Sequence, residues 1–133
     1  MPIAVLHLRR IAFKKQNGRC YYCGAFMWIK NQKQFASIHS LSLDNASKLQ
    51  CTAEHLVAQC DGGKNHKNNI VAACKHCNNS RHIMNPAPAP IPYKEIVERS
   101  VADNQWFDLE IINSMFKTAP YREEPRSVSC PSA

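Results

Sequence analysis

Two pairs of cysteines with the same short spacing are the residues of this sequence best suited to chemistry. They are Cys20-x-x-Cys23 and Cys74-x-x-Cys77, with residues 24–73 between them. Four thiolates in two such pairs are the usual ligands of a tetrahedral structural zinc ion. We therefore predict a zinc site that connects distant parts of one domain. Buried or redox-active cysteines are the alternative interpretation.

A second group of polar residues lies between the cysteine pairs and could hydrolyse a phosphodiester bond. Such a reaction needs a base that activates water and a cation that stabilises charge on the phosphate. His55 is the candidate base, since an imidazole can take up a proton near neutral pH. Glu54 precedes it. Because neighbouring side chains of a strand point to opposite faces, the carboxylate could bind a metal while His55 faces the water.

The order of these residues resembles the HNH endonuclease family. The shared series is Cys-x-x-Cys, acidic-His at 54–55, Gly-Gly at 62–63, Asn-Ile at 69–70 and Cys-x-x-Cys-Asn ending at residue 78. The resemblance covers residues 20–82 and is to the branch whose ββα-metal motif is braced by a four-cysteine zinc site. Three positions depart from that pattern: Glu54 replaces a more frequent Asp, Ala58 replaces a common Pro, and Asn78 replaces a common final His.

The resemblance implies roles for the residues around this series. Asn69 would be the central asparagine that braces the loop and helps to orient His55, and Asn78 would join Glu54 as a ligand of the catalytic cation. Carboxylate and amide oxygens suit Mg²⁺ or Mn²⁺ better than a second zinc ion. His82 follows Asn78 by four residues on the same helical face, so it could reach the cation or the scissile phosphate.

Basic residues dominate the part of the chain that contains these motifs. The sequence has 17 Lys and Arg against 10 Asp and Glu, and residues 1–81 hold twelve of the basic and three of the acidic side chains. A basic domain attracts nucleic acid because phosphate contacts release counterions, although a merely solvated basic surface is the alternative. Arg81 could clamp a phosphate with its planar guanidinium group. We expect DNA as the partner, with RNA left open, and contacts from Arg81, Lys64, Lys67, Arg9 and Arg10.

A small α+β domain of the ββα type would position these residues. Hydrophobic spacing predicts a basic helix over 4–16, strands over 25–30, 49–56 and 70–73, and a helix from Lys75, whereas residues 31–45 favour no element. Alternating prolines predict a polyproline II spacer, and helices are expected over 94–100 and 104–117. The predicted organisation is a nuclease domain over 1–85, a spacer over 86–92, a helical extension over 93–117 and a disordered tail over 118–133.

Cysteine usage and hydrophobic pattern bear on the compartment. Seven cysteines are an odd number, and their spacing favours metal in a reducing interior over disulfides. Residues 3–8 form too short an apolar run for a secretory signal, and no run approaches the ~20 apolar residues that span a bilayer. We expect a cytoplasmic protein without membrane contacts. Two other functions stay open: a non-catalytic zinc-stabilised nucleic-acid-binding or adaptor module, and a redox or thiol protein.

Overall fold

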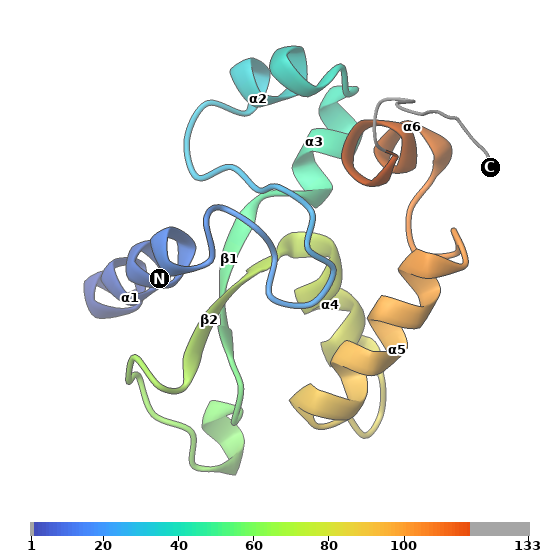
Figure 1. Ribbon diagram of the computed structural model, residues 1–133. Coiled ribbons are helices and arrows are strands. Elements are labelled where there is room, and N and C mark those ends of the chain that lie inside the picture. Colours follow the sequence, from blue (N-terminus) through green and yellow to red (C-terminus); the bar gives the residue numbers. More distant parts are fainter. Residues whose placement is uncertain (1, 118–133) are drawn as a thin grey trace, which may run out of the picture.

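Two short antiparallel strands, β1 (Cys51–His55) and β2 (Ile70–Cys74), run through the middle of the molecule (Figure 1). They are seen in a computed structural model that describes residues 2–117. In their register Cys51 lies opposite Cys74, and Glu54 lies opposite Val71. The fold is therefore a small α+β arrangement, as the sequence predicted, with a two-stranded sheet.

Two helices pack against this hairpin, α1 (Ile3–Lys15) and α4 (Lys75–Ile83) (Figure 1). The side chain of Gln16, directly after α1, donates to Ala72 O at 2.8 Å and accepts from Ala72 N at 2.9 Å. These two bonds satisfy the free edge of β2 as a neighbouring strand would. Helix α4 begins directly after β2, because the Cys74 side chain caps it by accepting from the backbone N–H of Cys77.

Residues 25–30 do not form the predicted strand. They make only isolated bridges within the described chain, between Arg19 and Phe26 and between Trp28 and Gln50. Gly24 has φ +79° and turns the chain back, so the backbone groups that follow pair with the preceding loop, as when Met27 N donates to Gly18 O at 2.9 Å. Tertiary pairing with a loop, rather than with a sheet, overrides the local strand propensity.

The segment for which the sequence favoured no element contains two helices, α2 (Gln32–His39) and α3 (Leu43–Lys48). Each has a side-chain cap at its start: Asn31 accepts from Gln34 N at 3.0 Å, and Ser42 accepts from Asn45 N at 3.1 Å. The caps satisfy backbone donors that the first turn of a helix leaves free, so short helices of mixed composition are stable here.

The predicted polyproline spacer over 86–92 is wrong at its C-terminal end. Helix α5 (Pro90–Ala102) starts at Pro90, so Pro90 and Pro92 lie in its first turn, where a proline loses no helical hydrogen bond. The predicted helix over 104–117 is also shorter than expected. It consists of α6 (Leu109–Ile111) and a π-helical turn over Ile112–Phe116.

One hydrophobic core includes both the hairpin region and the C-terminal helices. Tyr22, Leu49 and Val97 are at most 1% exposed and belong to the same buried cluster as Tyr93 and Ile111. The C-terminal helices therefore pack on the core and are not a detached extension. The predicted tail over 118–133 lies outside the described residues. None of the helices within residues 2–117 is long and apolar enough to span a membrane.

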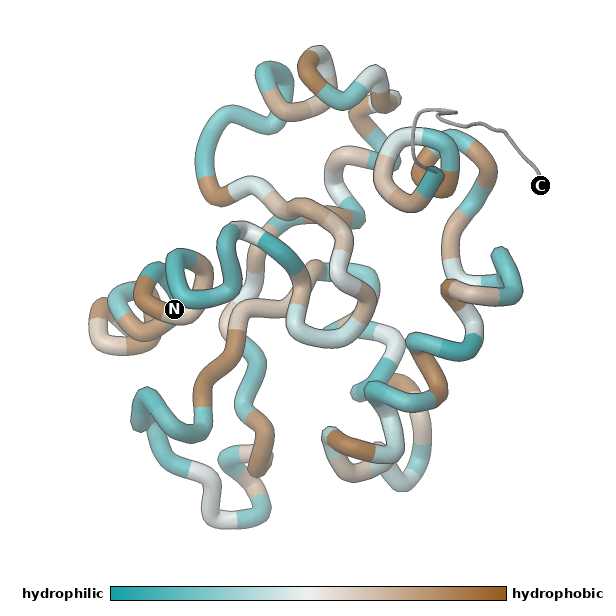
Figure 2. Tube along the Cα trace, viewed as in Figure 1, coloured by the Kyte–Doolittle hydropathy of each residue, from teal (hydrophilic) through white to brown (hydrophobic). Residues whose placement is uncertain are grey.

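The hydropathy of the residues along the chain follows this arrangement. In Figure 2 the far end of the loop between β1 and β2 is mostly hydrophilic, whereas β2 leads back toward the core through apolar residues. Within the loop, Gln59–Asp61 forms a short 3-10 turn. This loop contacts His55, and α4 contacts Glu54.

Candidate functional site

The four paired cysteines come together in one buried cluster. Cys20 and Cys23 belong to the turn after α1, here called the first knuckle (residues 20–23), and Cys74 and Cys77 belong to the second knuckle (residues 74–77). Their four Sγ atoms all lie within 4.8 Å of one another, and Cys23 Sγ is 4.0 Å from Cys74 Sγ. Tetrahedral zinc with Zn–S bonds of about 2.3 Å separates its sulfurs by about 3.8 Å. The donor set and its spacing fit a zinc ion, so the predicted cluster of four cysteines is confirmed as a group that could hold a metal.

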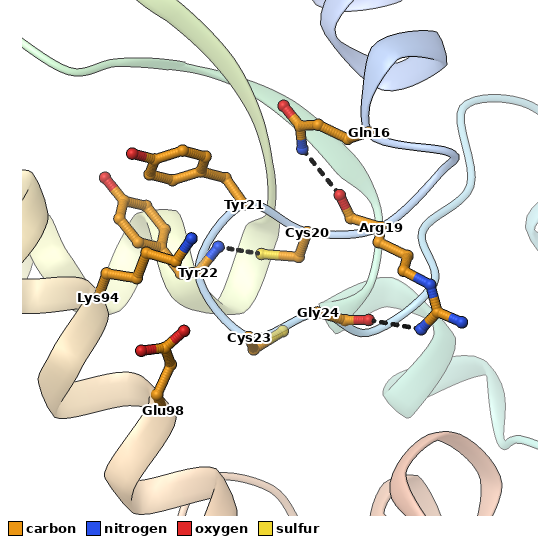
Figure 3. Close-up of a pocket in the computed structure, with 9 residues that line it drawn as sticks. All are labelled: Gln16, Arg19, Cys20, Tyr21, Tyr22, Cys23, Gly24, Lys94 and Glu98. Carbon is orange, nitrogen blue, oxygen red and sulfur yellow. Dashed lines mark hydrogen bonds between the residues drawn. The ribbon is translucent and has the colours of Figure 1, made fainter.

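Local hydrogen bonds shape the first knuckle. Cys20 N donates to Ala25 O at 2.8 Å and Gly24 N donates to Cys20 O at 3.0 Å, and these bonds fold the chain into a tight turn. Figure 3 shows Lys94 and Glu98 of α5 pointing toward this turn, across a pocket of about 330 Å³. The C-terminal helix thus lies directly beside the predicted metal centre.

Burial affects the thiols of the second knuckle and of a nearby cysteine. It raises the pKa of the Cys74 and Cys77 thiols, so a cation is needed to hold them as thiolates at neutral pH. Burial also raises the pKa of Cys51 to about 12, so this thiol stays neutral in the core and outside the cluster. Cys60 is exposed.

Glu54 is buried at the junction of β1 and α4, and three side chains hold its carboxylate. Oε2 accepts from Arg81 Nη1 at 3.0 Å and from the Tyr22 hydroxyl at 3.1 Å, while Oε1 lies 3.0 Å from His82 Nε2. Burial raises the pKa of Tyr22, with a further contribution from the Glu54 charge, so the phenol remains a donor to the carboxylate. The sequence contained no signal for Tyr22, because it lies 32 positions from its partner.

Arg81 does not lie where a phosphate clamp would. It is 5% exposed, and each guanidinium nitrogen already donates to an acceptor within the protein. Besides Glu54, these acceptors include Leu56 O at 3.2 Å and Pro88 O at 3.0 Å. The predicted phosphate contact is replaced by an internal ion pair, because a buried guanidinium group must be neutralised by a carboxylate.

His55 and Glu54 diverge from the end of β1. Whereas Glu54 faces α4, the ring of His55 turns toward the loop, where Nε2 lies 2.8 Å from Asn65 Oδ1. An amide oxygen only accepts, so Nε2 carries the hydrogen and Nδ1 is the ring atom left to take up a proton. Nothing in the sequence distinguishes Asn65 from the other polar residues of this loop.

Asn69 ties the two sides of the loop together. Its side chain accepts from Val57 N at 2.8 Å and donates to Val57 O and Lys64 O, both at 3.0 Å. The glycines of the motif serve the same turn: Gly62 has φ +91°, and a Cβ atom on Gly63 would overlap the Val57 carbonyl group. The side-chain hydrogen bonds of Asn69 are therefore to the backbone of the loop that follows His55, and not to the His55 ring.

Asn78 lies on α4 close to the strand that carries Glu54. Its Nδ2 donates to Thr52 Oγ1 at 3.0 Å and to Ala53 O at 3.5 Å, so the amide contacts the two residues before Glu54. Glu54 and His82 are in direct contact, whereas the side-chain contacts of Asn78 are with the neighbouring residues of β1. Within residues 2–117 the four cysteines are the only group of three or more His, Cys, Asp or Glu side chains placed to share a metal ion.

A cleft of about 490 Å³ opens beside His82. One wall is the start of the β1–β2 loop, including Leu56 and Val57, and the other is the segment 86–90 that the sequence predicted as a spacer. The side chain of His82 is 40% exposed, so it lies between the buried Glu54 and this cleft. His55 is not among the residues that line it.

The predicted nucleic-acid contacts differ in their surroundings. Arg10, Lys64 and Lys67 are exposed, and Lys67 lines a groove of about 270 Å³ between α1 and β2 together with Lys15. Arg9 is partly buried, and Nη1 donates to Cys51 O at 3.4 Å. Arg9 therefore packs α1 against the hairpin, while the other three can meet a polyanion.

Comparison with protein-family models, curated proteins and solved structures finds no match to this chain. The chemistry of the site therefore rests on its own residues and geometry.

Proposed function

We propose that the protein is a metal-dependent endonuclease that hydrolyses phosphodiester bonds in DNA at the junction of β1 and α4. The observation that carries this proposal is the buried carboxylate of Glu54, held between Arg81 and the cleft-lining His82 and directly followed by His55. A buried acid with a charged partner beside a cleft is typical of functional sites.

In this proposal His55 activates the nucleophile. Its Nδ1 takes a proton from a water molecule, the water oxygen bonds to phosphorus, and the bond from phosphorus to the leaving oxygen breaks. A solvent water then gives that oxygen a proton, and His55 returns its own proton to solvent. The hydrogen bond to Asn65 holds the required tautomer. Glu54, Asn78 and His82 would hold Mg²⁺ or Mn²⁺, which when bound stabilises negative charge on the phosphate. Exposed Arg10, Lys64 and Lys67 would contact the DNA backbone.

A plasmid assay tests this function. Zinc-loaded protein incubated with supercoiled DNA and Mg²⁺ or Mn²⁺ should give nicked or linear product, and His55→Ala should lower the rate by about 100-fold or more. His66→Ala is the matched control, because His66 is an exposed histidine of the same loop. Equal inactivity of the wild type and His55→Ala with both cations would overturn the proposal.

The ion pair of Glu54 with Arg81 favours a second candidate, a zinc-stabilised nucleic-acid-binding module without catalysis. In this reading the carboxylate only neutralises the buried arginine and is not free for a cation. The module would bind DNA or RNA with an affinity that falls as salt rises, and would leave both uncut. A salt-sensitive gel shift together with intact plasmid and RNA in the presence of Mn²⁺ would favour this candidate.

A further inference from the structure

Each sulfur of the four-cysteine cluster receives an N–H donor, and three of the four receive it from the knuckle backbone. Backbone N–H groups of the knuckles lie 3.2–3.5 Å from these sulfurs. The pairs are Tyr22 and Cys74 to Cys20 Sγ, Ala25 to Cys23 Sγ, and Cys77 to Cys74 Sγ. The donors Tyr22, Ala25 and Cys77 lie within three residues of the sulfur they contact, so each of these three sulfurs has a local donor, and Cys74 N adds a bond between the two knuckles.

Cys77 is the exception. Among the described residues, the only N–H donor to its sulfur is the indole of Trp106, whose Nε1 lies 3.3 Å from Cys77 Sγ and 29 positions along the chain. The fourth sulfur therefore depends on a tertiary contact. It is also the sulfur at the start of α4, the helix that carries Asn78, Arg81 and His82.

The C-terminal helices hold this indole in place. Tyr93 of α5 donates from its hydroxyl to Cys77 O at 2.6 Å, and its ring lies edge-on to Trp106 at 6.3 Å between centroids. The ring of His76, on α4, also lies edge-on to the indole, at 5.1 Å between centroids. Trp106 is thus fixed between α4 and α5, and its N–H is aimed at the metal-ligand sulfur.

We propose that Trp106 is a positioning residue of the zinc centre, whose indole N–H stabilises the Cys77 thiolate and sets how firmly the ion is held. A hydrogen bond to a thiolate withdraws electron density from sulfur, so the sulfur reacts more slowly with electrophiles. Loss of such an outer hydrogen bond typically weakens metal binding by about 10- to 100-fold. This inference needs only the four-cysteine zinc site and holds with or without nuclease activity.

Trp106→Phe tests the inference, since phenylalanine keeps an aromatic ring but donates no hydrogen bond. Trp28→Phe is the matched control, because the indole of Trp28 donates at 2.7 Å to the carbonyl of Ala46. Three measurements on the full chain apply: the rate of zinc transfer to a chromogenic chelator, peptide mapping of alkylation by iodoacetamide, and the thiolate-to-metal absorption band of the cobalt-substituted protein.

In Trp106→Phe we expect zinc transfer to be about 10-fold faster or more, alkylation of Cys77 before the other three cysteines of the cluster, and a shift of the cobalt band to longer wavelength. Exposed Cys60 reacts in every variant and does not count in this order. Trp28→Phe should match the wild type in all three. An unchanged cobalt band and transfer rate in Trp106→Phe would refute the inference, as would alkylation of another cysteine of the cluster before Cys77. If Trp106→Phe does not fold, benzothienylalanine at position 106, which replaces N–H by sulfur in the same shape, must give the same three changes.

Discussion

Arg81 and Glu54 form an ion pair, with Nη1 3.0 Å from Oε2, in which both side chains are almost completely buried. They lie 27 positions apart and join α4 to β1. A charge in such a place is tolerated only when it is paired. The pair therefore locks the helix that carries Asn78 and His82 onto the strand that carries His55.

Breaking this ion pair on one side should destabilise the protein strongly. Arg81→Met leaves the Glu54 carboxylate buried without its cation, and we expect a loss of about 3–5 kcal/mol in the free energy of unfolding. Exposed Arg10→Met should change it by less than about 0.5 kcal/mol. The double variant with Glu54→Met should lose less than the sum of the single changes. Urea unfolding at constant zinc measures the wild type, the three single variants and the double variant, and strictly additive losses would contradict the coupling.

Removal of zinc should unfold the region around the knuckles. The cluster joins the first knuckle to the second knuckle, so a zinc ion bound there would contribute its binding free energy to folding. Elemental analysis should give about one zinc per chain, and Cys74→Ser should abolish it. Cys51→Ser is the control, since Cys51 is buried nearby but outside the cluster. Zinc-free wild-type protein with an unchanged circular dichroism spectrum would contradict this prediction and favour a thiol protein.

The two neighbouring glycines of the loop should differ in their tolerance of alanine. In Gly62→Ala the added Cβ atom lies in open space. The only cost is the backbone strain of an alanine at positive φ, about 1–2 kcal/mol. Gly63→Ala forces the Val57 carbonyl to move and should break the Asn69 bonds that close the loop. Amide hydrogen exchange at Val57 measures this, with faster exchange in Gly63→Ala than in Gly62→Ala. The reverse order would show that the loop is closed in another way.

Acid should loosen the attachment of the C-terminal segment. Burial alone would raise the pKa of Asp108, but hydrogen bonds from Ile111 N and the Asn45 amide lower it, and a hydrogen bond from Ser42 N lowers the pKa of Glu110. Since both folded-state values are depressed, the stabilisation is present above about pH 4 and is lost as pH falls through the folded values.

Trp106 fluorescence in the Trp28→Phe background reports this attachment. We expect a change below about pH 4 that is reduced when Asp108→Asn and Glu110→Gln are added. Because protonation of the cysteines affects both proteins alike, the difference between the two titration curves isolates the two carboxylates. Coincident curves would show that these groups do not control the segment.

Much of the fold could be read from local patterns. The knuckles at Cys20 and Cys74 were predictable because ligand spacing is a property of a few consecutive residues. The hairpin around Glu54 and the helix after Cys74 were predictable because strand runs, turn residues and helical stretches are also local signals. The helices over 31–48 were missed because they depend on single caps, Asn31 and Ser42, within a mixed sequence.

The sequence by itself determined the two cysteine pairs that could bind a metal and the order of Glu54, His55, Asn69 and Asn78 along the chain. Only the tertiary structure decided that Arg81 is buried against Glu54 and that Trp106 reaches Cys77. The reason is physical. Whether a guanidinium group meets a phosphate or a carboxylate, and which N–H meets a sulfur, depends on side chains that converge from distant elements during packing, and no local spacing records that convergence.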